Sequence, residues 1–170
     1  MYTQNREPGH QQQTQTVSEL RGLAPGTLGI RQTLKLMKQL ALEGRKKDNV
    51  RELSLDLIKD LPQKSYVDEI RRIFEFVQSQ IRYVRDPDGL ETIHDTDAIL
   101  KLRQGDCDDK CILLAAMLKS IGVKPVRFVA LAFNKPYHYE HVLVQTKIGE
   151  NWVSLECTEP KPFGWTPPGS

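Results

Sequence analysis

The segment 107–121 is the feature that most limits how this chain can fold. Residues 113–118 are apolar on nearly every side of a helix, and Gly122 ends the pattern. A helix that is apolar all round is buried at the centre of a domain. Asp106, directly before the segment, is of a type that accepts hydrogen bonds from the first N–H groups of a helix. We therefore expect a buried central helix that begins at Cys107.

The patterns on either side of this helix are of two kinds, helical before it and strand-like after it. Gly44 and Gly105 are expected to close helices, because glycine tolerates the conformation found after a helix end. Ser65 opens a segment that fits a capping box. This order predicts an α+β fold, with N-terminal helices and a central helix packed on an antiparallel sheet. The predicted helices cover 27–43, 49–59, a segment beginning at 65 and a short segment capped by Asp95 or Thr96, and the predicted strands cover 126–133, 140–146 and 151–156.

The chain divides by composition into one domain with two unlike ends. A length of 170 residues is enough for a domain with its own core, and 39% hydrophobic residues is ordinary for a globular protein. Residues 1–26 are rich in glutamine and have little apolar surface to bury, so we expect a flexible segment there. The domain is predicted to span 27–160. Residues 161–170 form a proline-rich tail that is either extended over the domain or mobile.

Charge and cysteine content exclude several classes of protein. The chain has 24 Lys+Arg against 22 Asp+Glu, which is too balanced for nucleic acid or an anionic membrane to be the main partner. No apolar stretch is long enough to cross a bilayer, and the polar N-terminus does not have the pattern of a signal peptide. Three cysteines cannot form a closed disulfide framework. The expected compartment is therefore the cytoplasm.

A histidine and a carboxylate fall on the two strands of a predicted hairpin. If Lys147 pairs with Glu150 around a turn of two residues, His141 lies directly opposite Glu156. Residues in that relation have Cβ atoms about 4.5–5.5 Å apart, which allows a hydrogen bond between their side chains. The same register places apolar pairs on the other face, Val142 with Leu155 and Val144 with Val153.

These residues are of the types that a cysteine nucleophile needs. Cys107 lies in the first turn of a helix, where unpaired N–H groups and the helix dipole favour the thiolate, so we expect the pKa of its thiol to be lowered. His141 would take or hold the thiol proton, and Glu156 would orient the imidazole. The N–H of Cys107 would donate to the oxyanion of a tetrahedral intermediate. The predicted catalytic residues are thus Cys107, His141 and Glu156, with no cofactor and no metal.

The same residues resemble the transglutaminase-like superfamily of papain-like cysteine enzymes, over roughly 65–160. The resemblance implies Cys107 as nucleophile, His141 as base and Glu156 as the third member. The family usually has Asp-Pro-Thr at the acid, so the longer Glu156 and the missing proline are departures. The matching text is Gly105-Asp106-Cys107-Asp108-Asp109, Ile121-Gly122-Val123, Glu140-His141-Val142 and Trp152-Val153-Ser154-Leu155-Glu156-Cys157-Thr158, with Tyr83-Val84-Arg85-Asp86-Pro87 similar to bacterial and bacteriophage members.

The resemblance implies acyl transfer through a thioester on Cys107. The predicted reaction is hydrolysis of a peptide or amide bond in a protein or peptide substrate, and the alternative is crosslinking, in which an amine accepts the acyl group. A further alternative is an inactive assembly module, such as a component of a phage particle. That role would place the chain in a virion rather than in the cytoplasm of a bacterial or phage-infected cell.

A metal site is the remaining alternative from the residues alone. Cys107 and Cys111 are four residues apart on one helix, and His138, His141 or Cys157 could complete a set of thiolate and imidazole ligands. The spacing is not that of a familiar zinc pair, and the chain has no second cysteine pair.

Overall fold

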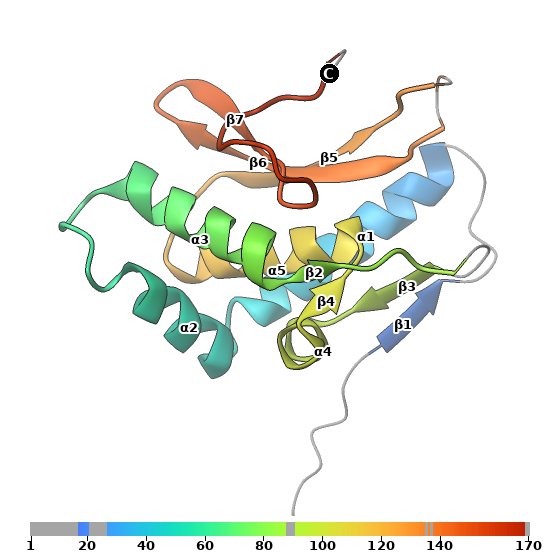
Figure 1. Ribbon diagram of the computed structural model, residues 1–170. Coiled ribbons are helices and arrows are strands. Elements are labelled where there is room, and N and C mark those ends of the chain that lie inside the picture. The colour runs from blue at the N-terminus through green and yellow to red at the C-terminus, as the bar shows by residue number, and fades with distance from the viewer. Residues whose placement is uncertain (1–16, 21–26, 88–90, 135, 137, 169–170) are drawn as a thin grey trace, which may run out of the picture.

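Among the residues that the structure describes, the fold has five helices, and the last of them lies at its centre (Figure 1). The computed structural model describes residues 17–20, 27–87, 91–134, 136 and 138–168. Residues 111–118 are all 0% exposed, which confirms the prediction of a buried central helix. The helices are α1 (Thr27–Gly44), α2 (Asp48–Ile58), α3 (Tyr66–Gln80), α4 (Thr96–Leu102) and α5 (Cys107–Ser120).

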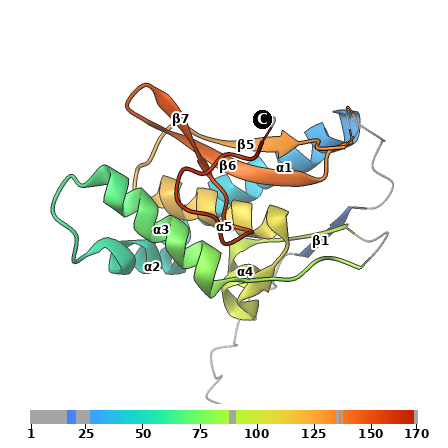
Figure 2. The same ribbon diagram turned by 45° about the horizontal axis from the view of Figure 1, so that its top comes forward.

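A three-stranded antiparallel sheet lies against one side of α5. Its strands are β5 (Val126–Leu131), β6 (His141–Ile148) and β7 (Asn151–Leu155), in the order β5-β6-β7. Figure 2 shows the sheet on one side of α5 and the helices α2 and α4 on the opposite side. The α+β arrangement predicted from the order of helices and strands is therefore confirmed. None of the helices in the described part of the chain is long and apolar enough to cross a membrane.

The hairpin between β6 and β7 is offset by two residues from the predicted register. Its turn is Gly149-Glu150, and Gly149 has a φ of 60°, as the first central position of a type II′ turn requires. An offset of two keeps every side chain on its predicted face, whereas an offset of one would have reversed the faces. The predicted pairing of His141 opposite Glu156 is thus wrong in register but right in face. The observed pairs run from Val144 with Leu155 to Ile148 with Asn151.

The described part of the chain also contains two smaller sheets that were not predicted. Strand β1 (Val17–Leu20) pairs antiparallel with β3 (Glu91–His94), and β2 (Arg82–Tyr83) pairs parallel with β4 (Gln104–Gly105). Strand β1 lies inside the segment 1–26, for which we expected flexibility. The rest of that segment lies outside the described residues.

The helices begin and end close to the predicted residues, but the residues at those ends play different parts from the ones expected. Gly44 is the last residue of α1 rather than a cap, and a Cβ there would lie 2.5 Å from Cγ2 of Thr96. Glycine is therefore needed for the close approach of two elements. Arg103, with a φ of 53°, ends α4 in place of Gly105. Ser65 makes no side-chain cap, because its hydroxyl donates to the carbonyl of Pro62.

The proline-rich tail packs over the domain as far as it is described, to residue 168. The ring of Phe163 meets Phe74 of α3 edge to face, with ring centroids 5.7 Å apart. The hydroxyl of Thr166 donates to that of Ser154 on β7 at 3.3 Å. The described part of the tail therefore lies over the domain but is not fully extended, because it turns where the N–H of Trp165 donates to the carbonyl of Pro162 at 3.0 Å.

Candidate active site

Cys107 is the first residue of α5, as its position after Asp106 predicted. The Asp106 carboxylate accepts a hydrogen bond from the N–H of Asp109 at 3.0 Å and so caps the helix. Gly105 allows the chain to enter this turn, because a Cβ there would lie 2.5 Å from Cβ of Asp109. The local sequence therefore holds the start of α5, and the Cys107 thiol with it, in one position.

His141 and Glu156 form a hydrogen-bonded pair at one end of the sheet. The distance between Nε2 of His141 and Oε2 of Glu156 is 2.6 Å, and the side chains are 14% and 2% exposed. His141 begins β6, and Glu156 directly follows β7. In the observed register the two are diagonal neighbours, which lie farther apart than directly opposed residues. A glutamate, one methylene longer than the usual aspartate, suits that longer span.

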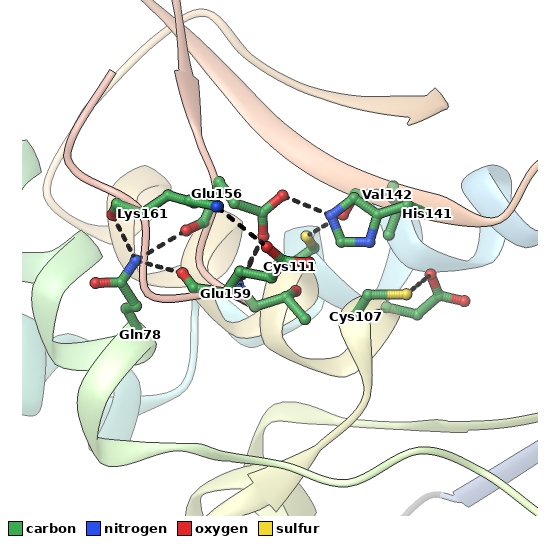
Figure 3. Close-up of polar contacts among 10 residues, drawn as sticks. Gln78, Cys107, Cys111, His141, Val142, Glu156, Glu159 and Lys161 are labelled. Atoms are coloured by element: carbon green, nitrogen blue, oxygen red, sulfur yellow. Dashed lines mark hydrogen bonds and ion pairs between the residues drawn. The ribbon is translucent and has the colours of Figure 1, made fainter. Parts of the chain in front are cut away.

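The thiol of Cys107 lies against the main chain next to His141. Burial raises the pKa of the Cys107 thiol, and the main-chain N–H of Val142, the residue after His141, acts against that rise. One turn along α5, the Cys111 thiol donates to the carbonyl of Val142 at 3.4 Å. In Figure 3 the His141 ring lies over Cys107, and the ring nitrogen turned toward the sulfur is Nδ1, the one not bonded to Glu156. His141 and Glu156 are thus in direct hydrogen-bond contact, and Figure 3 shows Cys107 in the same region without a hydrogen bond to His141.

Glu156 is held as a charged carboxylate. Its Oε1 accepts hydrogen bonds from the N–H groups of Thr158 at 2.8 Å and Glu159 at 3.3 Å. Burial alone would raise the pKa of Glu156, but the bond to His141, the charge of that ring and the two N–H groups outweigh it and lower the pKa. Both carboxylate oxygens are therefore occupied, one by the imidazole and the other by the main chain.

Gln78 of α3 fixes the segment that carries Glu156, a role that no sequence pattern predicted. Its Nε2 donates to the carbonyls of Glu156 at 3.0 Å, Glu159 at 2.7 Å and Lys161 at 2.8 Å. Figure 3 shows the amide pointing into this loop of main chain. The family pattern has a proline after the acid, and here a side-chain clamp restrains the same segment.

A second histidine pair lies beside the start of α5, and it was also missed. Asp109 accepts a hydrogen bond from the main-chain N–H of His94 at 2.8 Å, and its other oxygen lies 2.7 Å from Nδ1 of that ring. Asp109 is 2% exposed at its side chain. The pair ties β3 to the first turn of α5 and is therefore part of what positions Cys107.

The electrostatic surroundings of Cys107 contradict the expected thiolate. Burial raises the pKa of the Cys107 thiol, and the charges of Asp108 and Asp106 raise it further, while the N–H of Val142 lowers it. The thiol donates to Oδ1 of Asp108 at 3.7 Å. Burial, together with the carboxylates in the same turn, therefore outweighs the helix dipole. The expected lowering of the thiol pKa therefore disagrees with these surroundings, which raise it.

The alternative of a metal site finds no support in the described residues. No three histidine, cysteine, aspartate or glutamate side chains among them are arranged to hold a metal ion. His138 is 68% exposed and pairs with Glu140 at 3.4 Å. Cys111 and Cys157 are both fully buried, and burial raises the pKa of Cys111 well above its usual value.

A cavity of about 280 Å³ opens beside the imidazole of His141. The ring of Phe133 stacks on that imidazole, with ring centroids 6.4 Å apart. The cavity leaves room at the histidine for a ligand or for water. It is lined by Phe133, Glu140, His141, Glu156, Glu159, Trp165, Pro167 and Pro168.

Comparison with known proteins places this site in a family. The model of the transglutaminase-like superfamily matches residues 54–157, which is more than half of the chain and includes Cys107, His141 and Glu156. The chain belongs to the transglutaminase-like superfamily. Membership in this superfamily supports a cysteine-dependent enzyme in general terms.

Two solved structures resemble this transglutaminase-like chain at low identity. A putative protease from Parabacteroides distasonis ATCC 8503 superimposes with a TM-score of 0.59 and 15% identity, over 76% of this chain and 26% of that one. A putative cysteine protease from Cytophaga hutchinsonii gives a TM-score of 0.48 and 18% identity, over 65% and 37%. The chain thus spans about a quarter of the first protein, and that likeness supports the fold. A search of curated proteins finds no match.

We expect Asp108→Asn to increase the rate at which iodoacetamide alkylates Cys107. The pKa of Asp108 is raised to about 8 by burial and by the charges of Asp106 and Glu91, so Asp108 carries its full charge only above that pH. Asparagine keeps the shape and removes the charge. The thiol pKa should then fall, and each unit is about tenfold in thiolate fraction.

The increase should be about tenfold at pH 9 and should shrink below pH 8, where wild-type Asp108 is protonated. Mass spectrometry of the Cys107 peptide measures the rate. Asp56→Asn, which changes an exposed carboxylate on α2, is the matched control. Equal rates for wild type and Asp108→Asn across this range would mean that another group holds the thiol protonated.

Proposed function

We propose that this protein is a cysteine-dependent acyl-transfer enzyme that hydrolyses a peptide or amide bond through a thioester on Cys107. The observation that carries the proposal is the placement of His141, which is held by Glu156 through Nε2 and turns Nδ1 toward the thiol. A neutral imidazole that donates from Nε2 has its lone pair on Nδ1. That lone pair is where the thiol proton would go.

In the first half-reaction, Nδ1 of His141 takes the proton as the Cys107 sulfur attacks the carbonyl carbon of the substrate. The imidazolium is stabilised by the buried charge of Glu156. The N–H of Cys107 has no partner inside the helix and can donate to the oxyanion. The carbon–nitrogen bond then breaks, and His141 returns the proton to the leaving amine.

In the second half-reaction, water takes the place of the amine. His141 removes a proton from the water, the oxygen attacks the thioester, and the Cys107 sulfur leaves and regains its proton. Water needs only access to the imidazole, and the cavity beside His141 would provide that access. The substrate class proposed from this chemistry is a protein or peptide.

The proposal is tested with a mixture of glutamine-containing peptides, incubated with and without the primary amine dansylcadaverine. Hydrolysis predicts peptide fragments or deamidated glutamine in both samples, detected by mass spectrometry. Crosslinking predicts a dansyl adduct only where the amine is present.

Cys107→Ala should abolish the product, whereas Cys111→Ala, which removes a thiol one turn along the same helix, should leave it. Product formation by Cys107→Ala would contradict the proposal. No product from wild type, together with no acylation of Cys107 by an activated ester, would favour the assembly module.

A further inference from the structure

The position of Tyr83 is fixed by the short strand that precedes Cys107. Tyr83 on β2 pairs with Gly105 on β4, and the N–H of Val84 donates to the carbonyl of Gly105 at 2.9 Å. Gly105 is two residues before Cys107. Figure 1 shows β2 and β4 side by side where the chain enters α5. The main chain of Tyr83 is therefore held beside the start of the catalytic helix by backbone hydrogen bonds.

The side chain of Tyr83 points to the side of the ribbon on which α5 begins. Residues paired in register on neighbouring strands point to the same face. A Cβ at Gly105 would lie 2.5 Å from Cβ of Asp109 in the first turn of α5, so the side-chain position of Gly105 faces α5. Tyr83 shares that face.

The hydroxyl of Tyr83 is protonated and is available to a ligand. Burial raises the pKa of Tyr83, and among the charges that raise it further Cys107 comes first and Asp106 second. The hydroxyl therefore keeps its proton at neutral pH. Within the described part of the chain it makes no hydrogen bond, and Tyr83 is 45% exposed. It can donate to an incoming group without first breaking a bond to the protein.

We propose that Tyr83 is a further catalytic residue, whose hydroxyl donates a hydrogen bond to the oxyanion formed when Cys107 attacks a substrate carbonyl. The inference rests on the proposed function of the same site. It supplies a second donor beside the main-chain N–H of Cys107. One donor comes from β2 and the other from the N-terminus of α5, so the carbonyl oxygen is held between these two elements.

The role belongs to a defined step. The sulfur–carbon bond forms, the electron pair of the carbonyl double bond moves to oxygen, and the Tyr83 hydroxyl donates to that oxygen without losing its proton. When the tetrahedral intermediate collapses, the pair returns, and the bond from carbon to the leaving group breaks. Alkylation of the same sulfur by iodoacetamide displaces iodide and forms no oxyanion, so it does not use Tyr83.

The test compares these two reactions in wild type and Tyr83→Phe. Acylation of Cys107 by p-nitrophenyl acetate is followed by the burst of p-nitrophenolate, and alkylation by iodoacetamide is followed by mass spectrometry. Loss of one oxyanion donor costs about 100-fold or more. We therefore expect Tyr83→Phe to slow acylation by about that factor and to leave alkylation within about twofold. Tyr66→Phe, at an exposed tyrosine of α3, should change neither rate.

Acylation within about threefold of wild type would overturn the role of Tyr83. Equal slowing of acylation and alkylation would also overturn it, because Tyr83 would then act by shaping the thiol's surroundings. Failure of the proposed function is distinguishable, since wild type itself would then show no burst. Thermal unfolding of Tyr83→Phe checks that the variant is folded, and iodoacetamide reactivity at Cys107 checks that the site is formed.

Discussion

Replacing Glu156 by glutamine is expected to lower the rate of Cys107 acylation by roughly 1,000-fold or more while leaving the protein folded. Glutamine has nearly the same shape as glutamate, so the change tests the chemistry of the His141–Glu156 bond and not the packing around it. The large effect is expected from the way the main chain orients this side chain.

The main chain around Glu156 would fix which way the new amide points. The N–H groups of Thr158 and Glu159 both donate to Oε1 of Glu156, at 2.8 and 3.3 Å. In the variant the amide oxygen must stay there to accept those bonds, which leaves the NH₂ group facing Nε2 of His141. An NH₂ group donates, so Nε2 would have to accept and the ring proton would move to Nδ1. Nδ1 could then no longer take the thiol proton.

The burst of p-nitrophenolate measures this effect at neutral pH. Glu52→Gln is the matched control, because it makes the same chemical change at an exposed carboxylate of α2, outside the site. Glu156→Asp keeps a carboxylate that accepts from His141, but its side chain is one methylene shorter. It should therefore retain more activity than Glu156→Gln. A loss smaller than about tenfold in Glu156→Gln would show that His141 does not depend on the acid for its tautomer.

Periodic patterns of apolar residues in the sequence predicted the buried helix and the faces of the strands. The all-round apolar run places α5 at the centre, and the alternation in β6 and β7 places His141 and Glu156 on one face. The register was wrong by two because alternation has a period of two and cannot distinguish such offsets. The turn residue Gly149 would have been the better guide, since a type II′ turn puts glycine first.

The sequence could not predict contacts that join distant segments through single side chains. Gln78 contacts Glu156, which is 78 residues away in the sequence, and His94 contacts Asp109. No periodic pattern in the sequence predicts either contact. The thiol pKa was wrong for a different reason. Asp106 and Asp108 were visible beside Cys107, but their effect depends on burial, which a local sequence does not disclose.

Replacing Gln78 by glutamate is expected to destabilise the protein by about 2–3 kcal/mol and to impair catalysis at the same time. The Gln78 amide donates to the carbonyls of Glu156, Glu159 and Lys161. Glutamate has the same size but no donor when ionised, so a carboxylate oxygen would face those carbonyl oxygens. Hydrogen bonds would be replaced by repulsion in a half-buried place.

The loss of stability follows from the same contacts that hold the catalytic acid. Without the clamp, the segment 156–161 keeps only its own turn and its contacts with the domain. For a chain of this length, 2–3 kcal/mol corresponds to a fall in Tm of roughly 4–12 °C. Because Glu156 lies at the start of the segment, the acylation rate should fall as well, even at temperatures where the variant is folded.

Gln80→Glu provides the matched control for this change. Gln80 lies two residues along the same helix and is exposed, and among the described residues it donates only to the hydroxyl of Ser79, at 3.3 Å. It makes the same change of charge at the same end of α3, so it reports the effect of a negative charge near the C-terminus of a helix. Tm is measured by calorimetry, and the burst by p-nitrophenolate release. Equal losses in the two variants would assign the effect to charge on α3. A larger loss in Gln78→Glu, with the burst reduced only there, is the result expected of a clamp that positions the catalytic acid.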